Sequence, residues 1–149
     1  PLGLICIGSD RATGDCLGPL VVQSLMDFPV YSVYGTLQFP VHAKNLDKTM
    51  ELIYKFHKNP FIIAIDSCLG YEDHVGYITL SSMPLCPGRG VSKHLPPIGD
   101  ISITGIVDRF SESSHETIQT TRLQTVFYLA SFIAKGIQIP KFQVSYPHL

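Results

Sequence analysis

The sequence predicts an α/β protein, in which helices cover both faces of a mainly parallel sheet to give a three-layer α/β/α sandwich. Two segments, residues 3–7 and 61–65, are apolar throughout, as expected of strands that are covered on both faces. Stretches with apolar residues at helical spacing separate the strand-like segments, which is typical of parallel sheets with crossover helices. With 149 residues, of which 45% are hydrophobic, the chain can bury one substantial core, so we expect a single domain over residues 1–149.

The first half of the chain is predicted to alternate between strands and helices. A strand at residues 3–7 leads through a polar loop into a helix at residues 17–28, after which a proline follows. A short strand at residues 31–34 and a helix at residues 46–57 come next. This order favours parallel strands joined by helices that pack on the sheet.

The second half contains more strands and a long loop. Strands are predicted at residues 61–66 and 101–107, and a hairpin or edge strand at residues 75–80 gives at least one antiparallel strand. Residues 84–100 form a loop rich in proline and glycine, and loops of this length inside compact domains are more often functional than decorative. A single long helix is expected at the end. Its boundaries and apolar face are marked by Ser113 and Glu116 at capping-box spacing, by Ile118 to Ile137, and by Gly136 as the closing residue.

Composition excludes several classes of function. The formal net charge is −1 and the eleven Lys and Arg residues do not cluster, so we expect no nucleic-acid partner. The longest apolar-rich stretches, residues 61–65 and 126–134, are shorter than the roughly 20 residues of a membrane span, so we expect no membrane insertion. The four cysteines show no C-x-x-C spacing, which indicates reduced thiols in a cytoplasmic protein.

Two aspartates mark the candidate site. Asp15 lies in the loop after the first strand, and Asp66 ends the strand at residues 61–66. The carboxyl ends of parallel strands share one edge of a sheet, so we expect these two carboxyl groups to be neighbours. Two close carboxyl groups can share a proton, activate water and protonate a leaving amine, or they can hold a metal ion. The alternatives are a helix N-cap for Asp15 and an ordinary turn carboxylate for Asp66.

Two histidines could complete this site. His94 lies in the loop at residues 84–100 and could fold over the two carboxylates, either as a third metal ligand or as a group that orients substrate. His42 and Lys44 follow the strand at residues 31–34 and could line the same cleft. All three can equally be ordinary surface residues.

The chain resembles the sporulation-associated YyaC-type family, which is classed with spore proteases. The similarity spans nearly all of the chain, and the segments that carry it are residues 6–19, 34–37 with 40–46, 61–66, and 87–91 with 95–101. More distantly, residues 13–19 and 64–66 are similar to the two aspartate segments of the germination protease, which degrades small acid-soluble spore proteins. That similarity implies an aspartate-dependent endopeptidase.

A second distant similarity concerns hydrogenase maturation proteases. Asp15, Asp66 and His94 look like the three metal-contacting positions of that family. The resemblance implies a phosphorylase/hydrolase-like fold, and it implies that a divalent metal, Ni or Zn, could occupy these residues.

The leading hypothesis is therefore a sporulation peptidase in the cytoplasm of the forespore or mother cell. Asp15 and Asp66 would be catalytic without a required cofactor, and the substrate would be a protein or peptide such as a small acid-soluble spore protein. Five residues would position the substrate: Asp10, Arg11, Thr13, His42 and His94. The low charge and apolar tail are compatible with a homodimer. The alternative hypothesis is a non-catalytic sporulation protein that binds a metal or a peptide on the same fold.

Overall fold

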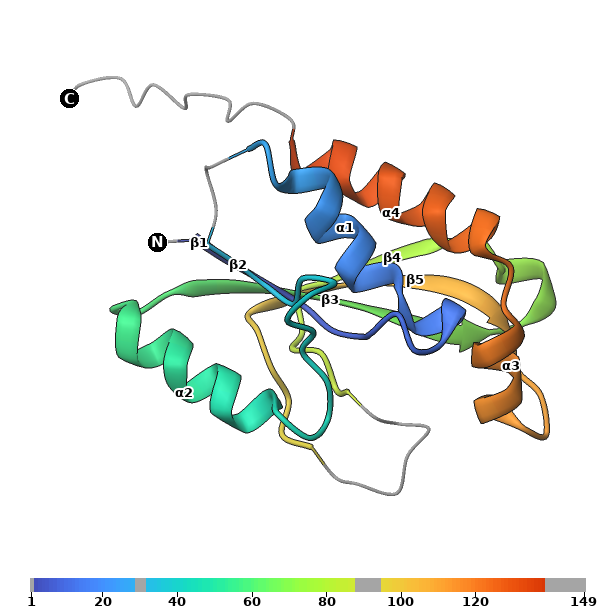
Figure 1. Ribbon diagram of the computed structural model, residues 1–149, viewed down its shortest axis with the longest axis horizontal. Coiled ribbons are helices and arrows are strands. Elements are labelled where there is room, and N and C mark those ends of the chain that lie inside the picture. The colour runs from blue at the N-terminus through green and yellow to red at the C-terminus, as the bar shows by residue number, and fades with distance from the viewer. Residues whose placement is uncertain (1, 29–31, 88–94, 139–149) are drawn as a thin grey trace.

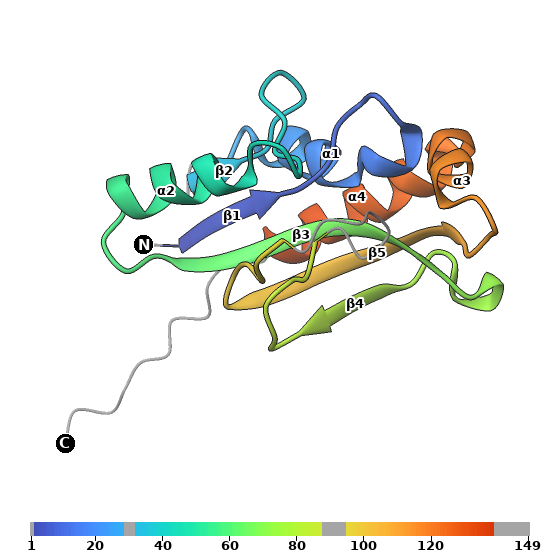
Figure 2. The same ribbon diagram turned by 90° about the horizontal axis from the view of Figure 1, so that it is seen from below.

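A five-stranded sheet organises the computed structural model, which describes residues 2–28, 32–87 and 95–138. The strand order is β2-β1-β3-β5-β4, and Figure 2 shows β1, β3, β5 and β4 side by side. All neighbouring strands are parallel except β4, which runs antiparallel to β5 at one edge of the sheet. The predicted mainly parallel sheet is confirmed. Its strands are β1 (Leu2–Cys6), β2 (Ser32–Tyr34), β3 (Phe61–Gly70), β4 (Ile78–Ser81) and β5 (Ile101–Arg109).

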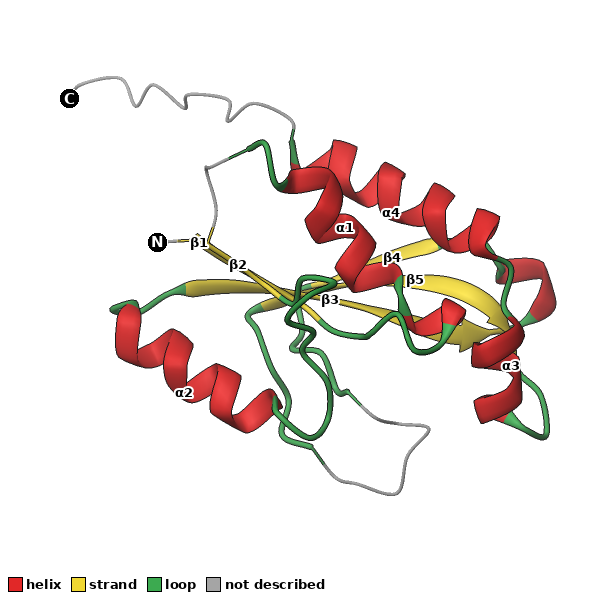
Figure 3. Cartoon of the chain, viewed as in Figure 1, coloured by secondary structure: helices red, strands yellow, loops and turns green. Residues whose placement is uncertain are grey.

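Helices cover both faces of this sheet. Helices α1 (Leu17–Leu25) and α4 (Leu123–Ile137) pack on one face, and α2 (Leu46–Phe56) packs on the other. Figure 1 shows α1 and α4 together on one side of the strands and α2 alone on the opposite side, and Figure 3 shows the same layers by element type. The predicted three-layer α/β/α sandwich is confirmed.

The apolar character of β1 follows from burial on both faces. Successive residues of a strand point to opposite sides of the sheet. Leu4 and Cys6 therefore belong to the core under α1 and α4, whereas Ile5 and Ile7 belong to the core under α2. None of these four side chains is more than 7% exposed. A strand that alternated apolar and polar residues would place polar groups in one of the two cores.

The predicted single helix at the end of the chain is wrong, because the segment forms two helices. Helix α3 (Ser114–Thr120) begins as predicted after Ser113, whose hydroxyl accepts a hydrogen bond from the Glu116 N–H at 3.4 Å. The break lies at Thr121, which has extended ψ of 139° and is only 4% exposed. Its hydroxyl lies 3.0 Å from Asp108 Oδ2 and 2.7 Å from the carbonyl oxygen of Thr117. These contacts of the Thr121 hydroxyl stabilise a turn at a point where the spacing of the apolar residues predicts that the helix continues.

Several other boundaries differ from the prediction. Helix α1 ends at Leu25 rather than at residue 28, and α4 continues through Gly136 to Ile137. Strand β3 extends past Asp66 to Gly70, because β5 goes on pairing with it after β1 has ended. The predicted edge strand is confirmed as β4, which starts at Ile78 after the 3-10 turn η2 (Glu72–His74).

The long loop between β4 and β5 is only partly described. Leu85 and Ile98 pair with each other through two backbone hydrogen bonds, and both side chains are buried in the core under α2. At the base of the loop, Asp100 donates its N–H to the carbonyl oxygen of Ile62 and accepts the Ile62 N–H at its carboxylate, both at 2.8 Å. His94 lies outside the described residues. In the part of the chain that is described, none of the helices has the length and apolarity needed to cross a membrane.

Candidate active site

The candidate site lies where the chain changes direction between β1 and β3. After β1 the chain crosses to β2 on one side of the sheet, and after β3 it continues to β4 and β5 on the other side. In open α/β sheets, ligands bind outside the carboxyl ends of strands at such a switch point. Asp15 follows β1, and Asp66 lies one residue beyond the last β1–β3 pair, Cys6 with Ile65.

Asp15 is held in a tight loop that folds back on the end of β1. It ends the 3-10 turn η1 (Thr13–Asp15), and the N–H of Ser9 donates to its carbonyl oxygen at 3.0 Å and to its Oδ2 at 3.1 Å. Gly8 makes this closure geometrically accessible, because its φ is +128° and a Cβ there would lie 1.9 Å from the Asp15 carbonyl oxygen. Asp15 does not cap α1, whose N-cap is Cys16.

The turn that carries Asp15 is supported from behind by α3. Gly14 is buried, and a Cβ at this position would lie 2.8 Å from both the carbonyl oxygen of Ile118 and the hydroxyl of Thr121. Thr121 is in turn anchored by the Asp108 carboxylate of β5. The break between α3 and α4 therefore helps to position Asp15.

Asp66 lies on the α2 face of the sheet, in register with Thr104 of β5. Its Oδ1 accepts the N–H of Ser67 at 2.8 Å. On the β1 side, Ile7 donates its N–H to the Ile65 carbonyl oxygen at 2.8 Å and is bridged to Val41. Apolar residues therefore flank Asp66 toward β1, and a threonine flanks it toward β5.

The pKa values of both carboxyl groups are raised. Burial raises the pKa of Asp15 from 3.8 to about 6, although the Ser9 N–H acts in the opposite direction. Burial also raises the pKa of Asp66 well above its ordinary value, and the negative charge of Asp15 raises it further. The two carboxyl groups therefore interact, and each ionises less readily than an aspartate in an ordinary environment.

Four further predicted site residues differ in their exposure. Asp10 and Arg11 are exposed on the loop after β1, and Thr13 is partly buried at the start of η1. His42 is partly buried at the entry to α2, and its neighbour Val41 accepts the Gly8 N–H at 2.8 Å. His42 therefore lies beside the loop that carries Asp15.

Two threonines were missed by the sequence analysis, namely Thr104 beside Asp66 and Thr79 on the next strand. Thr104 pairs with Asp66 in the sheet, and its hydroxyl contacts that of Thr79 on β4. Burial and the Asp66 charge raise the pKa of the Cys68 thiol, and a hydrogen bond with Thr104 partly offsets this effect. Cys68 is therefore a neutral thiol and not a thiolate nucleophile. These residues come together only through the register of the strands, and no local sequence motif indicates that register.

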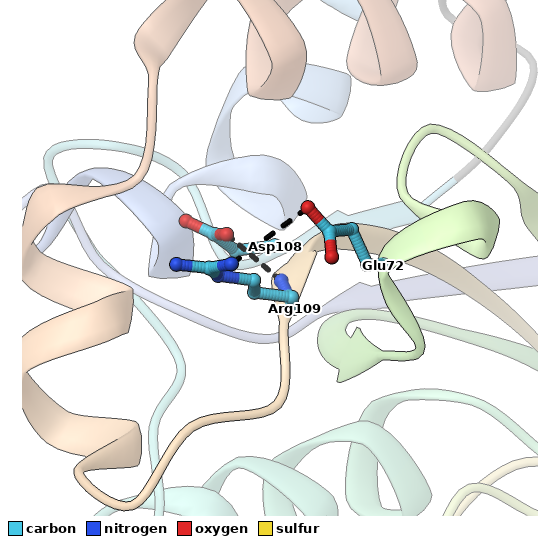
Figure 4. Close-up of polar contacts among 3 residues, drawn as sticks. All are labelled: Glu72, Asp108 and Arg109. Carbon is cyan, nitrogen blue, oxygen red and sulfur yellow. Dashed lines mark hydrogen bonds and ion pairs between the residues drawn. The ribbon is translucent and has the colours of Figure 1, made fainter.

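A cavity of about 380 Å³ lies farther along the strands and does not include the aspartate pair. It is lined by residues from the ends of β3 and β5, and Figure 4 shows the charged groups there. Arg109 Nη1 lies 3.7 Å from Glu72 Oε1, and the Arg109 N–H donates to Asp108 Oδ1 at 2.8 Å. Both partners of the ion pair are exposed, so the pair contributes little to stability.

The described residues do not make a complete metal site. Among residues 2–28, 32–87 and 95–138, no group of three His, Cys, Asp or Glu side chains could hold a metal ion. Asp15 and Asp66 offer carboxylate oxygens, whereas zinc sites use about three or four protein ligands. The third predicted ligand, His94, is outside the described residues.

Comparison with known proteins identifies the family. Residues 2–136 match the family described as "Protein of unknown function (DUF1256)". The chain belongs to this family. It is 45% identical over 141 residues to "Uncharacterized protein YyaC" of Bacillus subtilis (strain 168), an alignment that covers 93% of this chain and 69% of that protein. The predicted relation to the YyaC-type family is confirmed.

A solved structure shares the fold. The chain is similar to the [NiFe] hydrogenase maturation protease HycI from Thermococcus kodakarensis KOD1, with a TM-score of 0.58 over 91% of this chain and 88% of that chain. At 15% identity this similarity shows a common fold. The predicted relation to the fold of hydrogenase maturation proteases is therefore confirmed.

Proposed function

We propose that this protein is a peptidase in which Asp15 and Asp66 hydrolyse a peptide bond. The observation that carries the proposal is the interaction of two carboxyl groups with raised pKa values at the switch point of the sheet. A protease-like fold, similar to that of HycI, supports it. The peptidase proposal requires no cofactor.

The different environments of the two carboxyl groups are the reason for giving them different roles, one as the base and the other as the acid. The pKa of Asp15 is about 6, so this group is mostly ionised above that pH, whereas the pKa of Asp66 is raised well above its ordinary value, which favours the protonated form of Asp66. Asp15 accepts a proton from a water molecule as its oxygen attacks the carbonyl carbon of the substrate. Asp66 donates its proton to the amide nitrogen as the C–N bond breaks. Transfer of the proton from Asp15 to Asp66 restores the starting state.

Residues around the pair position the substrate in this proposal. Arg11 and Asp10 are exposed and can meet the polar backbone or side chains of a peptide, and the partly buried Thr13 and His42 are proposed as further positioning residues. His94 is also proposed as a positioning residue. In the alternative, Asp15, Asp66 and His94 bind Ni or Zn and the protein is not an enzyme.

The biological setting follows from the family resemblance. We propose that the protein acts in the cytoplasm of a forespore or mother cell, on small acid-soluble spore proteins or other peptides. We also propose that it forms a homodimer. The described surface includes many exposed large apolar side chains, such as Phe127, Tyr128 and Phe132 of α4.

A cleavage assay tests the peptidase proposal. The purified protein is incubated with small acid-soluble spore proteins and with a peptide library, and mass spectrometry detects new termini. We expect cleavage by the wild type, and at least about 100-fold slower cleavage by Asp66→Asn and Asp15→Asn. Asp27→Asn is the matched control, because Asp27 is exposed and remote from the pair.

Two outcomes would contradict the proposal. One is the absence of cleavage by a folded wild-type protein, and the other is equal cleavage by wild type and Asp66→Asn. Metal analysis of the untreated protein distinguishes the alternative, because stoichiometric Ni or Zn that is lost in His94→Ala would indicate a metal-binding protein.

A further inference from the structure

A cavity between β2 and α2, apart from its lining residue His42, has no role in the reaction described above. It has a volume of about 470 Å³, which lies in the range of about 300–1,000 Å³ that is usual for ligand sites. We call it the β2–α2 pocket. Its wall is formed by the carboxyl end of β2, the connection that follows and one side of α2, with the apolar side chains Val33, Tyr34, Phe39, Pro40, Val41 and Leu52.

No charged side chain lines the β2–α2 pocket among the described residues. Its lining contains no Asp, Glu, Lys or Arg. A charged ligand group would lose its hydration there without gaining an opposite charge, whereas an apolar group gains by leaving water. Phe39 and Leu52 are 72% and 49% exposed at this pocket, so a ligand that covers them would also bury apolar protein surface.

The polar groups of the lining are mostly engaged with one another. Asn45 Oδ1 accepts the His42 N–H at 2.8 Å, and its Nδ2 donates to the Pro40 carbonyl oxygen at 2.9 Å. The Thr49 hydroxyl donates to the Asn45 carbonyl oxygen at 3.0 Å, and the Thr36 hydroxyl accepts the Phe39 N–H at 2.9 Å. These hydrogen bonds hold the wall rigid and leave few groups to bind a polar ligand.

His42 supplies a hydrogen-bond donor in this wall. Its Nδ1 accepts the N–H of Lys44 at 3.2 Å, so its Nε2 carries a proton that it can donate. A ring N–H of this kind suits a peptide carbonyl oxygen.

The β2–α2 pocket lies against the loop of the candidate active site. Val41 lines the pocket, and its carbonyl oxygen accepts the N–H of Gly8, which contacts Asp15. Gly35, another lining residue, is so close to β1 that a Cβ on it would lie 1.8 Å from the Cys6 carbonyl oxygen. The pocket and the loop that carries Asp15 are therefore neighbours, as binding of a substrate side chain next to the cleaved bond requires.

We propose that the β2–α2 pocket binds one bulky, uncharged side chain, aromatic or aliphatic, of the peptide that the Asp15–Asp66 pair cleaves. Its role in cleavage rests on the proposed peptidase function, whereas its preference for an uncharged side chain rests on the lining alone. The pocket then determines which peptide bonds are cut.

The first test measures binding without cleavage. Four blocked amino acids, the N-acetyl amides of Phe, Leu, Glu and Lys, are titrated into ¹⁵N-labelled protein and followed by NMR. We expect the Phe and Leu derivatives to shift the amide signals of Gly35, Asn45 and Thr49, and the Glu and Lys derivatives to leave them unchanged. Equal shifts from all four compounds, or none from any, would overturn the proposal.

A substitution that adds a charge to the wall of the β2–α2 pocket tests whether the compounds bind there. Leu52→Glu adds a carboxylate to the lining, and Tyr54→Glu adds one to an exposed position of α2 outside it. We expect Leu52→Glu to bind the Phe derivative at least about tenfold more weakly than the wild type, and Tyr54→Glu to bind it as the wild type does. Unchanged binding by Leu52→Glu would overturn the proposal.

Cleavage of a peptide library separates this proposal from the peptidase proposal. We expect the wild type to prefer an apolar side chain at one position near the cut, and Leu52→Glu to shift that preference toward Lys and Arg. A wild-type preference that Leu52→Glu leaves unchanged would refute the specificity pocket and leave the peptidase intact. Binding of the apolar probes without any cleavage would refute the peptidase and leave the pocket's binding preference intact.

Discussion

Replacement of Asp15 by asparagine should change how the stability of the protein depends on pH. Asparagine has nearly the same shape, and its Oδ1 can still accept the Ser9 N–H that Asp15 accepts at 3.1 Å. What the variant loses is ionisation. The pKa of an aspartate in an ordinary environment is 3.8, and the pKa of Asp15 in the folded protein is about 6.

The direction in which stability changes with pH follows from proton binding. Between pH 3.8 and about 6 the folded protein holds more of the Asp15 proton than the unfolded chain does, so stability falls as pH rises through this window. The full pKa change corresponds to about 3 kcal/mol at about 1.4 kcal/mol per pH unit. Because Asp15 is partly exposed, we expect about 1–2 kcal/mol. This contribution is present near pH 4 and is lost by about pH 7.5.

Urea unfolding of wild type and Asp15→Asn from pH 4 to pH 7.5 measures this effect. The free energy of unfolding of the variant, relative to the wild type, should increase by about 1–2 kcal/mol over that range. Asp27→Asn, in which the replaced carboxylate is exposed, should follow the wild type throughout. Parallel curves for Asp15→Asn and the wild type would refute the statement that burial raises the pKa of Asp15.

Two other predictions concern the frame around the pair. Gly8→Ala should lower the free energy of unfolding by about 3 kcal/mol or more, because its Cβ would lie 1.9 Å from the Asp15 carbonyl oxygen at φ +128°. Gly136→Ala is the control, because Gly136 lies in a helix with open space around it, and it should instead raise the free energy of unfolding by about 0.5–1 kcal/mol. Thermal unfolding compares the two variants. Equal effects would contradict the close approach of Gly8 to the Asp15 carbonyl oxygen. Thr121→Val should cost about 1–3 kcal/mol in urea unfolding because Asp108 loses its buried hydrogen bond, and Thr121→Ser should restore most of it. A Thr121→Val protein as stable as the wild type would show that this contact does not hold the break between α3 and α4.

The sequence alone was sufficient for the layers of the fold. Unbroken apolar runs in β1 and β3 imply strands buried on both faces, and burial of Leu4 and Ile5 in opposite cores is the physical reason. The capping hydroxyl of Ser113 was also evident, because the residues that make this contact are close in the sequence.

Features that depend on contacts between distant residues were not predictable. The helix break at Thr121 depends on a hydrogen bond to Asp108, which lies 13 residues away. Extension of β3 beyond Asp66 depends on pairing with β5, which also brings Thr104 beside the carboxyl group. Periodicity in one segment carries no information about either contact, because the strand register is set by the whole sheet.

Carboxyl-selective NMR offers the most direct test of the central claim, which is that Asp15 and Asp66 form one interacting pair. The side-chain carboxyl signals are followed from pH 3 to pH 9 in the wild type and in Asp15→Asn. We expect Asp15 to titrate near pH 6, and we expect the pKa of Asp66 to be raised in the wild type and lower in Asp15→Asn, because the Asp15 charge contributes to it. Ordinary pKa values for both groups, or an Asp66 pKa that is the same in both proteins, would contradict the paired site and the mechanism built on it.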